Sequence, residues 1–282
     1  MNIFIAILLA GVTSSLYALS TTLQALEARR EPTSESLRSS LLKRLVRRPL
    51  WLAGTAAGLV AWPVQAVALA LASVAIVQPA LGLGLIVLLV LGVRLLHERV
   101  GPREIGGAVL IAGGIAVIGW AAPAHTPGFT RGAKAVVVAM LAVAAAAPYV
   151  LRALGRADGL TTSISAGFGW AAVGLATALI DAAIAHRHWV VALAWGAGVA
   201  AASWSSLLAE MSALQTWPAT RSIPVVFGIE MVLPAALLPL LARTPPGHLL
   251  SFGAALAVAC AGAIVLGSSR MVARAANPLT EP

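Results

Sequence analysis

The sequence contains few charged residues. Asp, Glu, Lys and Arg make up only 10% of its 282 residues, whereas soluble domains carry about 25%. Hydrophobic residues reach 60% of the chain, and the mean hydropathy is +0.92. The apolar runs are continuous and of helix length, without the alternation of a membrane barrel. We therefore predict an all-α, polytopic membrane protein.

Cysteine and enzyme motifs are also scarce. Cys260 is the single cysteine, so no disulfide can form within the chain. The five histidines lie in loops or at the ends of apolar segments, and no HExxH, GxSxG, CxxC or P-loop motif occurs. The net charge of +9 comes from residues at the segment ends, which does not favour nucleic-acid binding. We expect neither an enzyme nor a cofactor, and the pattern defines no metal site.

Nine apolar segments are long enough to cross a bilayer, which takes about 20 helical residues. They cover residues 2–24, 51–72, 74–96, 103–121, 133–152, 160–184, 189–215, 219–241 and 248–268. Basic residues follow the first segment, at Arg29 and Arg30, and none precedes it, which favours a membrane helix over a cleaved signal peptide. We predict nine transmembrane helices in the inner (plasma) membrane.

Lysine and arginine are distributed unevenly between the predicted loops, and this bias sets orientation. With the N-terminus outside, the outer side holds only Arg131, Lys134, Arg187 and Arg243. The other 15 of the 19 Lys and Arg residues then lie on the cytoplasmic side. We therefore predict that the N-terminus is outside and the C-terminus inside.

One predicted cytoplasmic loop, residues 25–50, is long and basic. Apolar residues recur in it at helical spacing, opposite basic ones: Leu37, Leu41, Leu42, Leu45 and Val46. A short amphipathic helix on the inner leaflet fits this pattern, and so does a solvated basic loop that only fixes topology. We also expect an external linker at residues 122–132 and a disordered cytoplasmic tail at residues 269–282.

The sequence contains a weak internal repeat. A shift of 145 residues aligns Gln65 with Glu210, and Pro79 with Pro224. In the predicted topology the two copies cross the membrane in opposite directions, as in the inverted repeats of secondary transporters. The predicted repeats are residues 1–121, with four helices, and residues 133–268, with five.

Two stretches resemble a known family. The segment ALASVAIVQPALGLGLIVLLVLGVRLLHERVGPREIGGAVLIAGGIAVIG is similar to the end of an EamA-like repeat of the drug/metabolite transporter superfamily. The stretch STTLQALEARR, the basic loop and the WLAG motif resemble the nine-helix NIPA-type magnesium transporters. The resemblance implies a secondary transporter and supplies no substrate-binding residue.

Two glutamates, Glu210 and Glu230, lie inside apolar segments. A charge in the hydrocarbon core costs roughly 2.5–3.5 kcal/mol on insertion scales, so such residues are functional candidates by default. Glu230 could instead be a protonated, hydrogen-bonded group, and Glu210 could pair with Arg221 or be hydrated. We interpret both as a candidate charged site for a substrate.

Uncharged polar and aromatic residues extend this candidate site. Gln65 and Gln78 either line the cavity that holds Glu210 or hydrogen-bond between helices. Trp62 and Trp204 precede Gln65 and Glu210 along the chain, and an aromatic wall beside a carboxylate suits an organic cation. Packing or lipid contact is the alternative for each tryptophan.

Proline and small residues indicate where helices bend or approach each other. Pro79 and Pro224 share a repeat position, and we predict a kink or gating role for both. Alanines at four-residue spacing, such as Ala255 and Ala259, allow close helix packing, either within the bundle or in a homodimer.

These features predict a secondary transporter that moves a small metabolite or a cation by alternating access. An anionic substrate is disfavoured because no Lys or Arg lies in the middle of a predicted span. Three alternatives remain open: a NIPA-type magnesium transporter, a flippase for a lipid-linked substrate, and a non-transporting membrane subunit of an envelope assembly.

Overall fold

The computed structural model describes residues 2–72, 77, 80–121, 131–154, 158–242 and 248–267. Throughout these ranges the regular secondary structure is helical and no strand occurs, which confirms the predicted all-α class. The predicted tail at 269–282 and most of the linker at 122–132 lie outside the described residues, as do Gln78 and Pro79.

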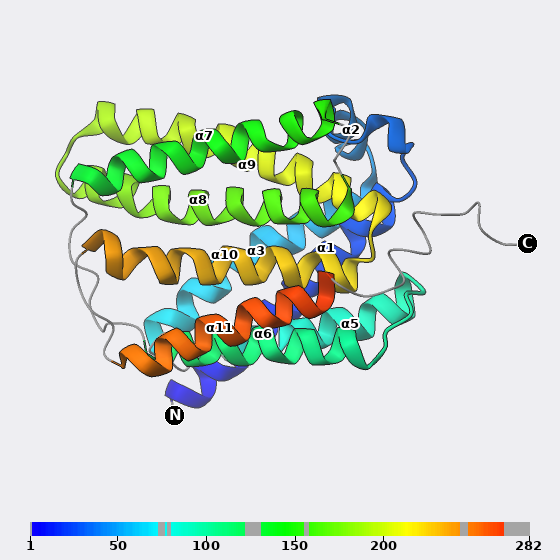
Figure 1. Cartoon of the computed structure of the whole chain (residues 1–282), viewed down its shortest axis with the longest axis horizontal. Helices are drawn as coiled ribbons and strands as arrows, with labels where there is room; N and C mark the ends of the chain where they lie inside the picture. The colour runs from blue at the N-terminus through cyan, green and yellow to red at the C-terminus, as the bar shows by residue number, and fades with distance from the viewer. Residues whose placement is uncertain are drawn as a thin grey trace, which may run out of the picture.

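Among the described residues, eight of the predicted apolar segments correspond to long helices, and the segment 74–96 corresponds to the shorter α5, Gly84–Leu95. The helices lie side by side along the length of the molecule (Figure 1). Their bounds are Asn2–Ala28 (α1), Pro49–Leu71 (α3), Gly84–Leu95 (α5), Pro102–Ala121 (α6), Arg131–Ala153 (α7), Gly159–Ala185 (α8), Trp189–Thr216 (α9), Ala219–Ala242 (α10) and Leu249–Gly267 (α11). A 3₁₀ turn, Thr33–Glu35 (η1), and a short helix, Ser39–Leu45 (α2), precede α3.

Three helices among the described residues are long and apolar enough to cross a membrane. They are Ile3–Ala28, Pro49–Leu71 and Trp189–Thr216. Two shorter apolar helices cover Ala80–Leu95 and Leu250–Leu266. Many large apolar side chains on the outer surface are exposed, among them Leu59, Leu193 and Leu250. Such a surface needs an apolar solvent, so the structure indicates membrane association.

Three helix pairs make the main contacts of the bundle: α1 with α3, α8 with α9, and α6 with α11. Small residues bring α6 and α11 together. A methyl group built on Gly114 would lie 2.8 Å from Cβ of Ala259 and 2.9 Å from the carbonyl oxygen of Ala255. Ala255 and Ala259 are buried. The predicted small-residue face at Ala255 and Ala259 therefore packs within the chain, against Gly114 of α6.

Residues 29–48, here called the cap segment, correct the prediction for the basic loop. The leucines of this segment do not face a lipid leaflet, and the segment is not a solvated loop. Leu37, Leu41, Leu42 and Leu45 are at most 2% exposed. Leu41, Leu42 and Leu45 pack in one cluster with Trp51 and with Leu208, Met211 and Leu214 of α9. An amphipathic face needs an apolar partner, and here α9 supplies it instead of lipid.

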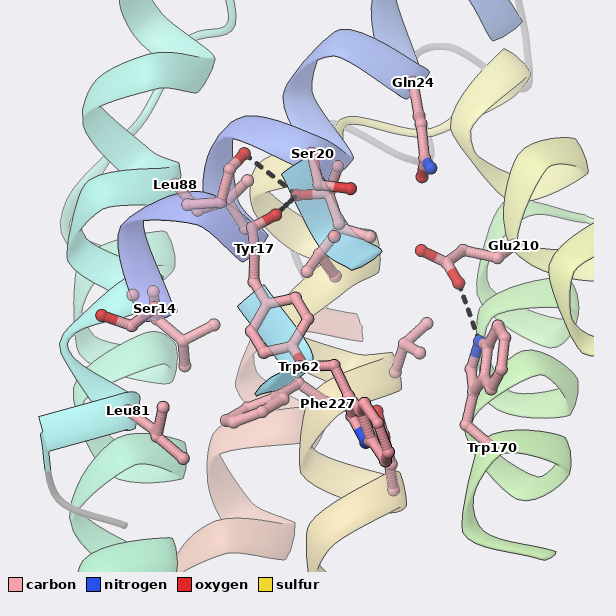
Figure 2. A pocket seen from close by; sticks show the side chains of 18 of the residues that line it. Ser14, Tyr17, Ser20, Gln24, Trp62, Leu81, Leu88, Trp170, Glu210 and Phe227 are labelled. Atoms are coloured by element: carbon pink, nitrogen blue, oxygen red, sulfur yellow. Dashed lines mark hydrogen bonds between the residues drawn. The ribbon is translucent and has the colours of Figure 1, made fainter. Parts of the chain in front are cut away.

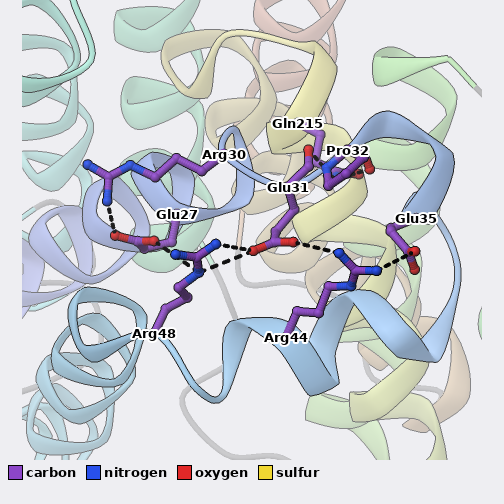
Figure 3. Close-up of polar contacts among 8 residues, drawn as sticks. All are labelled: Glu27, Arg30, Glu31, Pro32, Glu35, Arg44, Arg48 and Gln215. Carbon is purple, nitrogen blue, oxygen red and sulfur yellow. Dashed lines mark hydrogen bonds and ion pairs between the residues drawn. The ribbon is translucent and has the colours of Figure 1, made fainter.

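The charged side chains of the cap segment form a network of alternating sign with the end of α1 (Figure 3). Its members, in order, are Arg30, Glu27, Arg48, Glu31, Arg44 and Glu35, with nitrogen–oxygen contacts of 2.7–3.8 Å. The side chains of Glu27 and Glu31 are 2% and 4% exposed, whereas the arginines remain about half exposed. The network therefore compensates two nearly buried carboxylates and fixes the shape of the segment.

Glu35 lies at the outer edge of this network. A hydrogen bond from Ser40, together with the charge of Arg44, holds the pKa of Glu35 below its ordinary value. Because the folded pKa is depressed, the stabilisation is present at neutral pH and is lost as the pH falls through the folded pKa.

Glu98 and Glu104 are paired at the same end of the molecule. α5 ends at Leu95 with Leu96 as its C-cap, and His97 takes the left-handed conformation with φ of 53°. The amide of Glu98 then donates to the carbonyl of Gly92 at 3.0 Å, which closes the chain back over the last turn of α5.

This closure places the carboxylate of Glu98 at the start of α10. There it accepts hydrogen bonds from the amides of Ala219 (2.6 Å) and Thr220 (2.9 Å) and from Arg29. A negative charge at a helix N-terminus is stabilising. The side chains of Arg221 and Glu104 pair at 2.6 Å with exposures of 4% and 6%, and they join α10 to α6.

The close contact of α6 with α11 gives a matched test. Gly114→Ala should lower the free energy of unfolding by about 1–3 kcal/mol, because its methyl group has no space. Gly113→Ala, one residue earlier, should leave stability unchanged or raised, because nothing lies within 4 Å of its methyl group. Melting temperatures in one detergent compare the two, and equal values would contradict this packing.

Candidate functional site

A cavity of about 580 Å³ lies inside the bundle, lined by α1, α3, α5, α8, α9 and α10. Its walls are largely apolar, with Leu85, Leu88, Val226 and Phe227 among them. Figure 2 shows polar side chains that project into this space from α1 and α9. The volume is within the range of roughly 300–1,000 Å³ that is typical of small-molecule sites.

Glu210 of α9 lines the cavity and is 7% exposed. Its carboxylate accepts a hydrogen bond of 2.8 Å from the indole nitrogen of Trp170 on α8 (Figure 2). The predicted alternative partner, Arg221, pairs with Glu104 instead, so that alternative is wrong. Glu210 therefore has one neutral donor and no cationic partner among the described side chains.

Glu230 of α10 lines the same cavity and is half-buried. Within the described ranges, no side chain or amide forms a hydrogen bond or an ion pair with its carboxylate. The cavity therefore contains carboxylates from two different helices, and neither is neutralised by an arginine or a lysine. The structure brings together the two acidic residues that the sequence singled out.

Gln65 of α3 faces the cavity and accepts a hydrogen bond of 3.1 Å from the hydroxyl of Tyr17. Gln24 of α1 donates to the hydroxyl of Thr55 at 3.2 Å in the same cavity. These two pairs tie α1 to α3 beside the carboxylates. Gln65 therefore lines the same cavity as Glu210, the residue with which it aligns in the predicted repeat.

Tyr17 and Gln24 were not predicted from the sequence as site residues. A signal for them exists, because the polar residues of α1 that line the cavity recur every three or four positions. They are Ser14, Tyr17, Ser20, Thr21 and Gln24. This spacing puts all of them on one helix face, so a polar stripe on an otherwise apolar helix marks the cavity side.

The other predicted site residues have different outcomes. Trp62 lines the cavity and is 70% exposed, so it stands at the edge of the opening. Trp204 is not among the lining residues and is 45% exposed, which corrects its predicted place beside Glu210. Pro224 is buried within α10, and the helix continues through it. The role of Gln78 and Pro79 stays a prediction, because both lie outside the described residues.

The chemistry of the cavity favours a positive or neutral ligand. None of the described residues that line it is Lys or Arg, whereas two are carboxylates and several carry amide or hydroxyl oxygens. Two carboxylates in an apolar surrounding repel each other, and a cation or a proton between them relieves that repulsion. Trp62, Trp170 and Tyr17 add aromatic faces that attract cations.

A tightly chelated metal is a different arrangement. Over the described part of the chain, no group of three or more His, Cys, Asp and Glu residues could hold a metal ion together. A hydrated divalent cation needs fewer protein ligands, because Mg²⁺ keeps several of its waters. The two carboxylates, the amide oxygens of Gln24 and Gln65 and the hydroxyl groups of the lining offer oxygen ligands to it.

Comparison with known proteins leaves the family open. No protein-family model matches the chain, and no solved structure matches it. A stretch of 114 residues is 32% identical to an uncharacterized protein of Corynebacterium glutamicum, which covers 40% of this chain and 39% of that relative. The family resemblance drawn from the sequence therefore stays a prediction.

Removing the donor to Glu210 tests the local geometry. Trp170→Phe leaves a nearly buried carboxylate without its hydrogen bond, so we expect a loss of about 1–3 kcal/mol in the free energy of unfolding. Trp204→Phe, outside the cavity, should change it by less than about 0.5 kcal/mol. Melting temperatures of the purified variants check this, and an unaffected Trp170→Phe would show that the bond contributes nothing.

Proposed function

We propose that this protein is a multi-pass secondary transporter of the inner membrane that carries a small cation or a neutral metabolite. We also propose that it belongs to the drug/metabolite transporter superfamily, as the sequence resemblance implies. The observation that carries the proposal is the convergence of Glu210 and Glu230 on one cavity inside an apolar bundle. Intramembrane carboxylates that face a cavity, and do not pair, mark pathways for cations and protons. The substrate would bind between α9, α10 and α1.

The repeat predicted from the sequence supports an alternating-access mechanism. Gln65 and its repeat partner Glu210 line the cavity from α3 and α9. The two halves also have similar helix contacts: α1 packs on α3 and α5 in the first half, and α8 packs on α9 and α10 in the second. The corresponding helices α6 and α11 pack on each other. Inverted repeats with a site at their interface are typical of secondary transporters.

The other predicted functions differ in what the cavity binds. A NIPA-type magnesium transporter would use the carboxylates for a hydrated cation. A membrane subunit without transport activity would bind no ligand, and its glutamates would affect stability alone.

Flipping of a lipid-linked substrate is favoured by one specific observation. Leu59 and Trp62 of α3 line the cavity, and each is 70% exposed on the outer surface. Among the described helices, α3 has its main contact with α1 alone. An apolar tail could therefore leave the cavity beside α3 while a polar head stays at the carboxylates.

A ligand screen by thermal unfolding tests the proposed function. The purified protein is heated with Mg²⁺, other divalent cations, choline-like amines, amino acids and sugars, and with amphiphiles that carry a cationic head. A ligand at 100 times its dissociation constant should raise stability by about 2.7 kcal/mol. Glu230→Gln should abolish the shift caused by a cation, because it removes the charge without changing the shape of the side chain.

Two tryptophans provide the matched control. Trp62→Ala changes the cavity wall and should weaken binding, whereas Trp204→Ala removes the same side chain outside the cavity and should not. Equal effects of the two variants, or a cation shift that survives in Glu230→Gln, would place the binding site elsewhere. A screen without any shift would favour the membrane-subunit alternative.

A further inference from the structure

The cap segment lies directly over one end of the cavity. On three helices, a residue that lines the cavity lies about one turn or less from a residue of the cluster that holds the leucines of the segment. These pairs are Gln24 and Ala28 on α1, Thr55 and Trp51 on α3, and Glu210 and Met211 on α9. In each pair the cluster residue is the one nearer the end of the bundle that holds the cap segment and its arginines, here called the basic end. No residue of the segment, which the structure describes in full, lines the cavity itself, and its leucines, as part of this cluster, cover that end of the bundle.

The cap segment contacts the second half of the chain through few polar bonds. The amide of Leu37 donates to the hydroxyl of Ser212 at 2.8 Å, and the side chain of Gln215 donates to the carbonyls of Glu31 (3.3 Å) and Pro32 (3.2 Å). Arg152 of α7 donates to the carbonyl of Ser36 at 2.6 Å. The bonds from Gln215 and Arg152 use backbone carbonyls of the segment as acceptors, whereas Arg29, at the start of the segment, donates to the carbonyl of Leu214 at 3.4 Å.

The ion pairs of the segment, in contrast, stay within the first half. Every member of the network from Arg30 to Glu35 belongs to residues 27–48. The network thus preserves the shape of the segment and does not attach it to α9. From Arg30 onward, the segment can separate from α9 as a folded unit with this network still paired, while Arg29 at its start is held by Glu98 and by the carbonyl of Leu214.

The buried residue at the centre of the contact is strained. Leu37 has φ of 54°, a left-handed conformation that is costly for a residue with a side chain, and it is 2% exposed. Its bond to Ser212 and its burial beside Ala166, Ala209 and Val226 hold it there. Release from α9 would let this backbone relax, and the relief of strain would offset part of the free energy needed to separate the two surfaces.

α2 also has a second apolar environment available. Its leucines lie on one face, and Lys43 and Arg44 on the other face are exposed. Val46, which was predicted on the leucine face, follows the end of α2 and is 50% exposed, which corrects that prediction. A short helix with this pattern binds at a membrane interface. Its leucine face can therefore be covered by α9 or by the head-group region of the adjacent leaflet.

From these contacts we propose that the cap segment is a gate. Docked on α9, as in this structure, it closes the cavity at the basic end; released from α9, with its leucine face on the membrane interface, it opens that end to the carboxylates. The proposal rests on the proposed transport function for its purpose. Its test requires no substrate, so either idea can fail while the other holds.

Thiol labelling measures the opening. Cys260, the single cysteine, is exposed and is first removed as Cys260→Ser. Ser212→Cys then places a thiol beneath Leu37, in a protein reconstituted into liposomes. A membrane-impermeant maleimide, applied from the basic side, should label it slowly and from that side alone.

A second change releases the gate. Gln215→Ala removes both bonds to Glu31 and Pro32 and should speed labelling of Ser212→Cys by about tenfold, because labelling follows the population of the open state. Ser206→Cys is the matched control, since Ser206 is also buried on α9 but lies beside Gly169 and away from the segment. Its labelling should not change.

Two results would overturn the proposal. Ser212→Cys could stay fully protected over hours both with and without Gln215→Ala, which would make the segment a fixed part of the fold. Alternatively, Ser206→Cys and Ser212→Cys could accelerate together, which would mean that α9 as a whole has loosened. Arg152→Gln repeats the test by removing the bond to Ser36, should Gln215→Ala prevent folding.

Discussion

The constraint on which this structure depends is the cost of placing charge inside an apolar bundle. An isolated ion in a low-dielectric interior is costly, so each must find a partner or a polar cavity. Five glutamates meet the constraint with arginines at the basic end: Glu27, Glu31, Glu35, Glu98 and Glu104. Glu210 and Glu230 meet it with a cavity. The pairing of the first group leaves the second as the carboxylates available to a ligand.

The two groups are connected through the helices that hold them. Glu98 fixes the start of α10, and Glu104 binds Arg221 within the first turn of that helix, so the helix that carries Glu230 is anchored at its basic end. Glu210 lies on α9, whose following turn supports the leucines of the cap segment. A movement of the basic end of the bundle would therefore act on both sides of the cavity. This arrangement links closure of that end to the environment of the carboxylates.

The sequence predicted the all-α class and the positions of the long helices, because continuous apolar runs of about 20 residues leave few alternatives. Three described helices are long and apolar enough to cross a membrane, and the count of nine spans and their orientation stay predictions. The sequence also predicted that Gln65 lines the same cavity as Glu210, because equivalent positions of two inverted repeats meet at the repeat interface. It misplaced Trp204, because an apolar run with no clear polar face does not reveal which side a tryptophan occupies. The leucines of the cap segment were recognised as one face, but an amphipathic pattern does not state whether lipid or protein covers it. The pair Arg221–Glu104 joins residues 117 positions apart, a proximity that only the packed fold creates.

Charge movement through the cavity tests the central claim most directly. Proteoliposomes adsorbed on a solid-supported membrane are exposed to sudden jumps of Mg²⁺ or of an organic amine, and the displaced charge is recorded. The account predicts a transient current with the native protein, its loss when Glu210→Gln and Glu230→Gln are combined, and its retention in Trp204→Ala. A current of the same size in the double variant, or no current with any cation, would contradict the claim that these two carboxylates form a cation transport site.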